Sequence, residues 1–220
     1  MVPALCVREP LTNVLRPRNF AMLLFGRNLQ RFVPGALSFF SQYGSTTRSE
    51  PMGERHELAG TLLDQAGRLV VLLDSLATTL YDKEDPAQPS VLKYPPRALR
   101  EAAINALVHR NYQMVDPLRI TAFSDRVEIV SPGALPLGLS LPRLRSGKAT
   151  PVWRNQALAW FFNRLGYAEA EGQGIQTMLD ALRSSGSPPP RFEADEVRVV
   201  CTIKAHPRAK KVDRSLRGDS

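Results

Sequence analysis

The stretch EAAINALVHRNY, residues 101–112, combines the composition of a buried helix with polar side chains at every fourth position. On a helical wheel Glu101, Asn105 and His109 fall within an arc of about 80°. Alanine, leucine, isoleucine and valine fill most of the remaining circumference. An apolar surface this wide predicts a helix that is buried on nearly all sides.

The polar row on this helix has two interpretations. A carboxylate and a carboxamide that face packed apolar groups are costly without partners, so the row would border a cavity, a ligand or water. Alternatively, the row is the solvent face of a surface helix, with Glu101 and Asn105 wet. His109 taken alone is more often a structural histidine than a ligand. The wheel supports both interpretations about equally, and the downstream sequence favours the first.

The segments around this helix predict a mixture of helices and strands. Pro95 and Pro96 suit its start, because proline's fixed φ favours the first turn and its missing N–H costs nothing there. Residues 117–123 and 126–131 alternate apolar and polar side chains and predict two strands joined by a tight turn. Residues 132–151 are irregular, and long loops of this kind are often lids. A helix over 155–167, a glycine turn into a helix over 171–186, and a strand over 197–205 complete this half.

The first half contains weaker patterns. Residues 18–26 predict a short helix, residues 35–44 a strand, and residues 45–53 a polar loop. Leucines and an alanine at helical spacing from Leu58 to Leu80 predict one long amphipathic helix over residues 54–81. The resulting division is a linker subdomain at 1–53, a main domain at 54–204 and a basic disordered tail at 205–220.

The chain is basic, with 29 Lys and Arg against 21 Asp and Glu and a net charge of +8. Residues 204–220 hold six Lys and Arg and two Asp, which is half of that charge. A solvated, disordered tail is the preferred interpretation. Contact of the tail with anionic nucleic acid is the alternative.

The two cysteines, Cys6 and Cys201, lie near opposite ends and form neither a CxxC pair nor a zinc pattern. We therefore expect a reducing, cytoplasmic location. The apolar runs near the N-terminus are too short for a signal peptide or a membrane span, so no membrane association is expected.

Two glycine turns are candidates for contacting a phosphorylated ligand. SPGALP (131–136) ends a strand, and EGQGI (171–175) opens a helix whose N-terminal N–H groups suit an anion. Gly172 and Gly174 would allow close approach of the backbone, although two glycines before a helix are commonly only a turn. SGKAT (146–150) is not a P-loop, because Pro142 stands where the upstream glycine belongs and Ala149 follows the lysine.

The order of these features resembles the GHKL, or Bergerat-fold, ATPases, such as histidine kinases and gyrase-type topoisomerases. ALREAAINALVHRNY, DRVEIVSPGALP and LGYAEAEGQGI look like the RecG-like C-terminal ATP-binding branch, whose members are often described as transcriptional regulators. The resemblance extends over residues 13–204. It implies an α/β fold, an α+β sandwich with a Bergerat-type mixed sheet and helices packed on one face, preceded by a small linker subdomain.

The resemblance also implies roles for individual residues. Glu101 matches the general base that activates water, and Asn105 matches the ligand of Mg²⁺, both chemically suited to these tasks. Gly172 and Gly174 match the glycine box near the phosphates of ATP. Residues 137–154 match the lid, and His109 belongs to the same nucleotide-binding set.

Two positions depart from the pattern at the adenine site. Ser131 stands in place of the aspartate that reads the adenine amino group, with Gly133 at the expected spacing, and Leu135 replaces a glycine. Adenine selection is therefore open.

The family often places a Schlafen-type AlbA domain ahead of the linker, and we expect this chain to lack it. The leading hypothesis is a regulatory domain that binds Mg-ATP with slow or no hydrolysis, with DNA contacted through the missing domain or the tail, and with a homodimer as a further expectation. The alternatives are a non-catalytic DNA-binding regulator with a degenerate site and a remnant that folds poorly.

Overall fold

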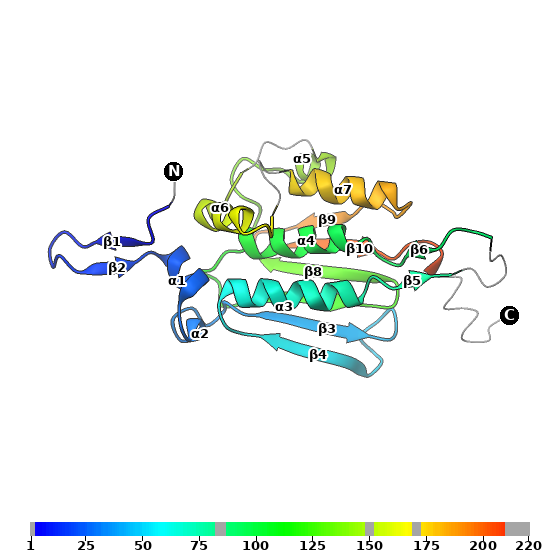
Figure 1. The fold of residues 1–220 in the computed structure, drawn as a ribbon, viewed down its shortest axis with the longest axis horizontal. Helices are drawn as coiled ribbons and strands as arrows, with labels where there is room; N and C mark the ends of the chain where they lie inside the picture. The colour runs from blue at the N-terminus through cyan, green and yellow to red at the C-terminus, as the bar shows by residue number, and fades with distance from the viewer. Residues whose placement is uncertain (1–2, 82–86, 148–151, 169–172, 210–220) are drawn as a thin grey trace.

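A six-stranded mixed sheet organises the computed structural model of the chain, which describes residues 3–81, 87–147, 152–168 and 173–209 (Figure 1). The strand order is β4-β3-β7-β8-β10-β9, and only the β3–β7 pair is parallel. The strands are β3 (Ser38–Tyr43), β4 (Met52–Leu58), β7 (Leu118–Ala122), β8 (Arg126–Pro132), β9 (Arg191–Ala194) and β10 (Arg198–Lys204).

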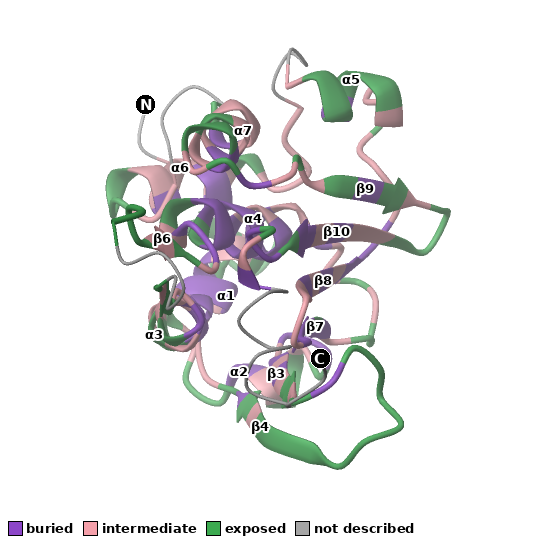
Figure 2. Ribbon diagram, turned by 90° about the vertical axis from the view of Figure 1, so that its right-hand side faces the viewer, coloured by how far each residue is buried: buried purple, intermediate pink, exposed green. Residues whose placement is uncertain are grey.

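The main helices lie on one face of this sheet, and Figure 2 shows the opposite face without a helix along its central strands. They are α3 (Leu62–Ser75), α4 (Pro96–His109) and α7 (Gly174–Ser184), with α4 packed between the other two and against β7 and β8. The predicted fold class, a mixed sheet with helices on one face, is confirmed.

The predicted long helix over residues 54–81 is wrong at both ends, because the helix stops at Ser75 and Thr79–Leu80 forms strand β5. Met52–Leu58 is strand β4, paired with β3, and the helix begins only at Leu62. Gly60 has φ +95°, a left-handed conformation that ends the extended strand. Thr61 then starts the helix through a capping box with Asp64. Leu58 is fully buried at the end of the strand, so its spacing from the helical leucines misled the prediction.

Several other predicted elements are confirmed. The helix expected at 18–26 is α1 (Asn19–Phe25), the helix expected at 155–167 is α6 (Gln156–Arg164), and the strand pair is β7 and β8. The sequence did not predict β9, α2 (Leu29–Phe32), the hairpin of β1 (Cys6–Arg8) and β2 (Leu15–Pro17), or the pair β5 (Thr79–Leu80) and β6 (Val91–Leu92). In the stretch predicted to be irregular, α5 (Leu141–Ser146) ends at Gly147 with φ +67°.

Residues on both sides of the predicted main domain, 54–204, pack with that domain in the structure. Strand β3 comes from the range predicted as a linker, yet it lies inside the main sheet between β4 and β7. At the other end, Ala205, His206 and Ala209 are buried and the His206 N–H donates to the Lys93 carbonyl, so the first part of the predicted tail is packed. Residues 210–220 lie outside the described residues.

The core lies between the sheet and the helices and is built largely around α4. Nine of its residues are buried, among them Leu99, Ile104 and Leu107. Burial of aliphatic side chains of this size stabilises the fold by about 1.5–3 kcal/mol each. Glu101 is buried and Asn105 and His109 are half-buried, so the polar row of this helix is not an open solvent face. No helix in the described part of the chain is long and apolar enough to cross a membrane.

Candidate nucleotide site

Helix α4 is held at both ends by features that fix its polar row. Pro96 occupies its first turn. At the other end, the Asn155 side-chain amide donates to the carbonyls of Val108 and Arg110, 2.8 Å each, and the Arg154 guanidinium donates to the His109 carbonyl at 3.0 Å. These bonds satisfy carbonyls that a helix C-terminus leaves without partners.

The polar row borders a cavity of about 1210 Å³, counted out to its solvent-open mouth. Most of the lining is apolar and comes from α4, β8, β10 and α7. The lining includes six of the seven predicted site residues: Glu101, Asn105, His109, Ser131, Gly133 and Gly174. The seventh, Gly172, lies outside the described residues.

At one end of the cavity, the first residue of α7 lies directly against the polar row. A Cβ atom at Gly174 would lie 2.5 Å from Glu101 Oε2 and 3.0 Å from Asn105 Nδ2. Only glycine leaves both side chains in these positions. The N-terminus of an 11-residue helix, with its partial positive charge, therefore meets a carboxylate and an amide within the same cavity.

The Asn105 side chain has unused hydrogen-bonding capacity at this end. Its Nδ2 atom is buried and has no hydrogen-bond partner among the described residues. Leaving a buried amide group unpaired costs about 1–3 kcal/mol. Rotation of the amide exchanges Nδ2 and Oδ1, so the side chain can offer the cavity either a donor or an oxygen. A polar ligand at this position would remove the cost.

The β8 end of the cavity contains Ser131 and Gly133. The Ser131 hydroxyl donates to the Ala106 carbonyl at 2.9 Å. Ala106 lies five residues, about 7.5 Å along the helix axis, beyond Glu101 and directly follows Asn105. Gly133 has φ +108°, and a Cβ there would lie 2.7 Å from Asn111 Cβ, so glycine is required for the turn that follows β8.

His109 stacks on Trp153 at the wall of the cavity, with ring centroids 5.3 Å apart and planes 14° from parallel. Burial and the nearby Arg154 guanidinium lower the pKa of His109 from 6.5 to about 4. The imidazole is therefore neutral at pH 7 and can offer one donor and one acceptor. It adds no charge to the site.

Sequence reasoning missed the contributions of Trp153, Arg154 and Asn155. A polar residue just before a helix is usually read as its N-cap, and Asn155 does precede α6. Its side chain makes no cap bond to α6 and instead binds the end of α4. A long-range role of this kind leaves no local signal in the sequence.

The described residues contain no group of three or more His, Cys, Asp or Glu side chains arranged to hold a metal ion. Asn105 nevertheless fits Mg²⁺, which keeps several waters and is commonly bound by one or two protein oxygens together with substrate phosphates. The buried amide at the cavity wall supplies one such oxygen.

The fold is a mixed α/β sheet with a cavity beside its helices, and comparisons with known proteins relate part of it to ATPase-like domains. Residues 116–203 match the family model described as "Putative ATP-dependent DNA helicase recG C-terminal". The matched region runs from just before β7 through most of β10, so it includes Ser131, Gly133 and Gly174 but not α4. The match supports an ATPase-like domain for this part of the chain.

A solved structure shares the fold. The crystal structure of the DIP2311 protein from Corynebacterium diphtheriae is similar over 86% of this chain and 38% of that chain, with a TM-score of 0.69 and 21% sequence identity. This chain therefore corresponds to less than half the length of that protein. No match is found among the curated proteins.

Proposed function

We propose that the chain binds Mg-ATP in the cavity along α4 and uses the bound nucleotide in a regulatory role. The observation that carries the proposal is the meeting of Glu101 and Asn105 with Gly174 in a cavity that Ser131 and Gly133 also line. Two sets of polar groups, one at Gly174 and one at Ser131, together with apolar walls suit a ligand with a charged part and a planar, polar-edged part.

The phosphate end of the nucleotide is assigned to the α7 N-terminus. Unpaired N–H groups and the helix dipole favour an anion there. Asn105 would hold Mg²⁺ through its amide oxygen, and the ion would neutralise charge on the phosphates. Glu101 is the proposed general base, positioned to accept a proton from a water that attacks the terminal phosphate.

The adenine end is assigned to Ser131. Because its hydroxyl proton is already donated to the Ala106 carbonyl, the oxygen can only accept from a ligand. The aspartate that Ser131 replaces in the family pattern also accepts, so the polarity of the contact is retained. The 6-amino group of adenine donates, whereas guanine has an oxygen at that position, so this polarity favours adenine over guanine.

Calorimetric titration with Mg-ATP and Mg-GTP tests the proposal. The wild type should give a saturable heat with ATP, and Asn105→Ala should weaken binding at least tenfold through loss of one metal ligand. Asn19→Ala removes the same group at an exposed position on α1 and should bind like the wild type. Ser131→Ala should reduce the preference for ATP over GTP by about tenfold, the worth of a hydrogen bond in a desolvated site.

Two results would contradict the proposal. One is the absence of saturable heat in the wild type, and the other is equal affinity in the wild type and Asn105→Ala. A regulatory role predicts that turnover, measured as phosphate release, is slow compared with nucleotide exchange.

A further inference from the structure

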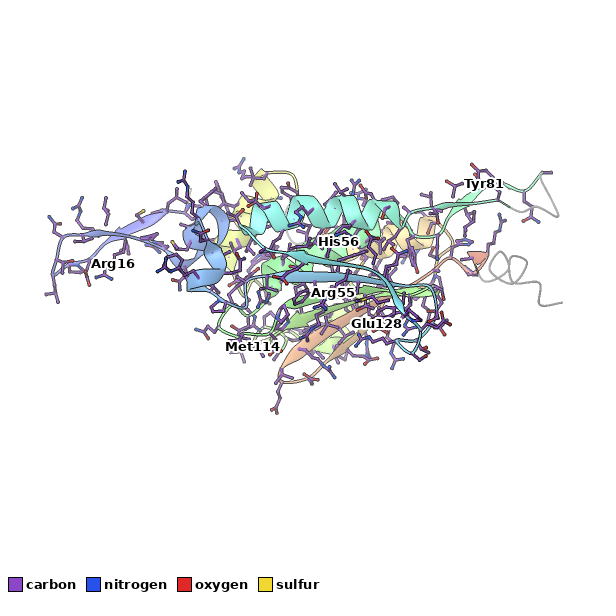
Figure 3. All side chains as sticks on the ribbon, turned by 90° about the horizontal axis from the view of Figure 1, so that it is seen from below. Arg16, Arg55, His56, Tyr81, Met114 and Glu128 are labelled. Carbon is purple, nitrogen blue, oxygen red and sulfur yellow. The ribbon has the colours of Figure 1, made fainter. Side chains whose placement is uncertain are left out.

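The open face of the sheet, on the side away from the cavity, carries a second recessed surface. A hollow of about 660 Å³, counted out into open solvent, lies over β4, β3 and β7. Alternation along the strands separates it from the core. In Figure 3, Arg55 and His56 project to opposite sides of β4, and His56 packs near the buried Phe40 on the helix side. We call this surface the β3 hollow, lined mainly by Phe39, Ser41, Tyr43, Arg48, Arg55 and Arg119.

Three arginines give the β3 hollow its charge. Arg48, Arg55 and Arg119 are exposed, and among the described residues no carboxylate forms an ion pair with any of them. By contrast, Arg126 and Arg191 on the same face pair with Glu128 and Glu193. The unpaired guanidiniums are thus concentrated over one part of the sheet.

Aromatic rings form the floor between these arginines. The Arg55 guanidinium lies 4.9 Å from the centre of the Phe39 ring. Tyr43 stacks on Phe123, with centroids 5.6 Å apart and planes at 18°, and Arg126 covers Phe123 at 4.0 Å. Arg126 and Tyr43 both lie against Phe123, and the Tyr43 ring of this stacked pair lines the hollow. A planar group entering the hollow would extend this stack.

We propose that the β3 hollow binds a single strand of nucleic acid, with bases stacked on Tyr43 and Phe39 and phosphates held by Arg48, Arg55 and Arg119. Single-strand-binding surfaces combine stacking rings with a basic track, because every base has a π-face and every link a negative charge. A base pair in a duplex is already stacked on both faces and cannot reach recessed rings. An acidic protein segment would match the arginines but would leave the rings without partners.

This proposal is independent of nucleotide binding, because the hollow and the cavity lie on opposite faces of the sheet. The test uses the full chain without ATP and a fluorescently labelled oligothymidylate of about 12 nucleotides, within the site size of one small binding domain. Anisotropy is measured over a series of salt concentrations. The basic residues 210–220 are present in every variant, so their contribution cancels in the comparisons.

Two pairs of variants separate charge from stacking. Arg55→Gln/Arg119→Gln should weaken binding about tenfold at moderate salt and reduce the slope of log K against log salt by about 1.4. Arg16→Gln/Arg183→Gln removes the same charge from exposed positions elsewhere and should change the slope little. Tyr43→Leu should weaken binding about tenfold, whereas Tyr43→Phe keeps the ring and should bind like the wild type.

Retention of single-strand binding in the Arg55/Arg119 variant would overturn the proposal, as would an equal loss in the Arg16/Arg183 control. Tighter binding to a duplex of the same length, or equal competition by polyglutamate, would assign the surface to a different partner. Circular dichroism of each variant shows that the fold is retained, and the arginine pair alone decides the outcome if Tyr43→Leu does not fold.

Discussion

Replacing Gly174 with alanine tests the closest contact in the cavity. The new Cβ would lie 2.5 Å from Glu101 Oε2 and 3.0 Å from Asn105 Nδ2, and both atoms are the ends of flexible side chains. The backbones of α4 and α7 can therefore stay in place while the carboxylate and the amide move. The fold should therefore lose little stability, whereas the Glu101 and Asn105 side chains should lose their positions in the cavity.

The magnitudes of the two effects differ in a measurable way. Alanine is favoured over glycine in a helix by up to about 1 kcal/mol, which offsets the cost of moving two side-chain ends. We expect the free energy of unfolding to change by less than about 1 kcal/mol. Loss of one or two hydrogen bonds to a charged ligand costs about 1.5–3 kcal/mol each, so affinity for Mg-ATP should fall at least tenfold.

The assay combines urea unfolding with calorimetric titration, and Gly67→Ala on α3 is the matched control. A Cβ at Gly67 would meet only the Tyr167 hydroxyl, at an ordinary 3.5 Å. This control should gain up to about 1 kcal/mol of stability and bind nucleotide normally. Wild-type affinity in Gly174→Ala would show that the displaced Glu101 and Asn105 side chains have no part in nucleotide binding, contrary to the proposal. Unfolding of the variant would show that the contact is structural.

Two further predictions concern stability. The pKa of His109 in the folded state, about 4, is below its unfolded value of 6.5. The buried neutral imidazole therefore contributes its full share to the free energy of unfolding above pH 6.5, and this stabilisation is lost as pH falls towards 4. Between pH 7 and pH 5 the free energy of unfolding, measured in urea, should fall by about 2 kcal/mol more in the wild type than in His109→Gln. Parallel pH profiles of the two proteins would contradict this. Asn155→Ala removes two bonds to the end of α4 and should cost about 2 kcal/mol, whereas Asn163→Ala removes one bond of 3.2 Å and should cost about half as much. Equal unfolding midpoints of Asn155→Ala and the wild type would argue against the capping role.

Local patterns in the sequence predicted the elements that surround the site. Several features act within a few residues and can be recognised without knowledge of the fold. They are the proline at the start of α4 and its wide apolar surface, the alternation in β7 and β8, and the glycine that begins α7. The row of Glu101, Asn105 and His109 was compatible with a cavity, since unpaired polar groups are costly in a packed core, or with a solvent face, and the downstream sequence favoured the cavity. The structure places all three on that cavity.

Features that depend on distant contacts were not predictable. Strand β4 reads as helix because Leu58 continues the leucine spacing of α3, and only pairing with β3 makes it a strand. Asn155 reads as a cap for α6, but its amide reaches the end of α4. The Tyr43–Phe123 stack joins residues 80 positions apart along the chain.

The most direct test of the nucleotide site is a crystal structure of the chain with Mg²⁺ and a non-hydrolysable ATP analogue. We expect the analogue to lie along α4, with its terminal phosphates at Gly174, the metal ion on the Asn105 amide oxygen, and the adenine amino group donating to Ser131 Oγ. A nucleotide bound elsewhere, or a cavity filled by repacked side chains under saturating analogue, would contradict it.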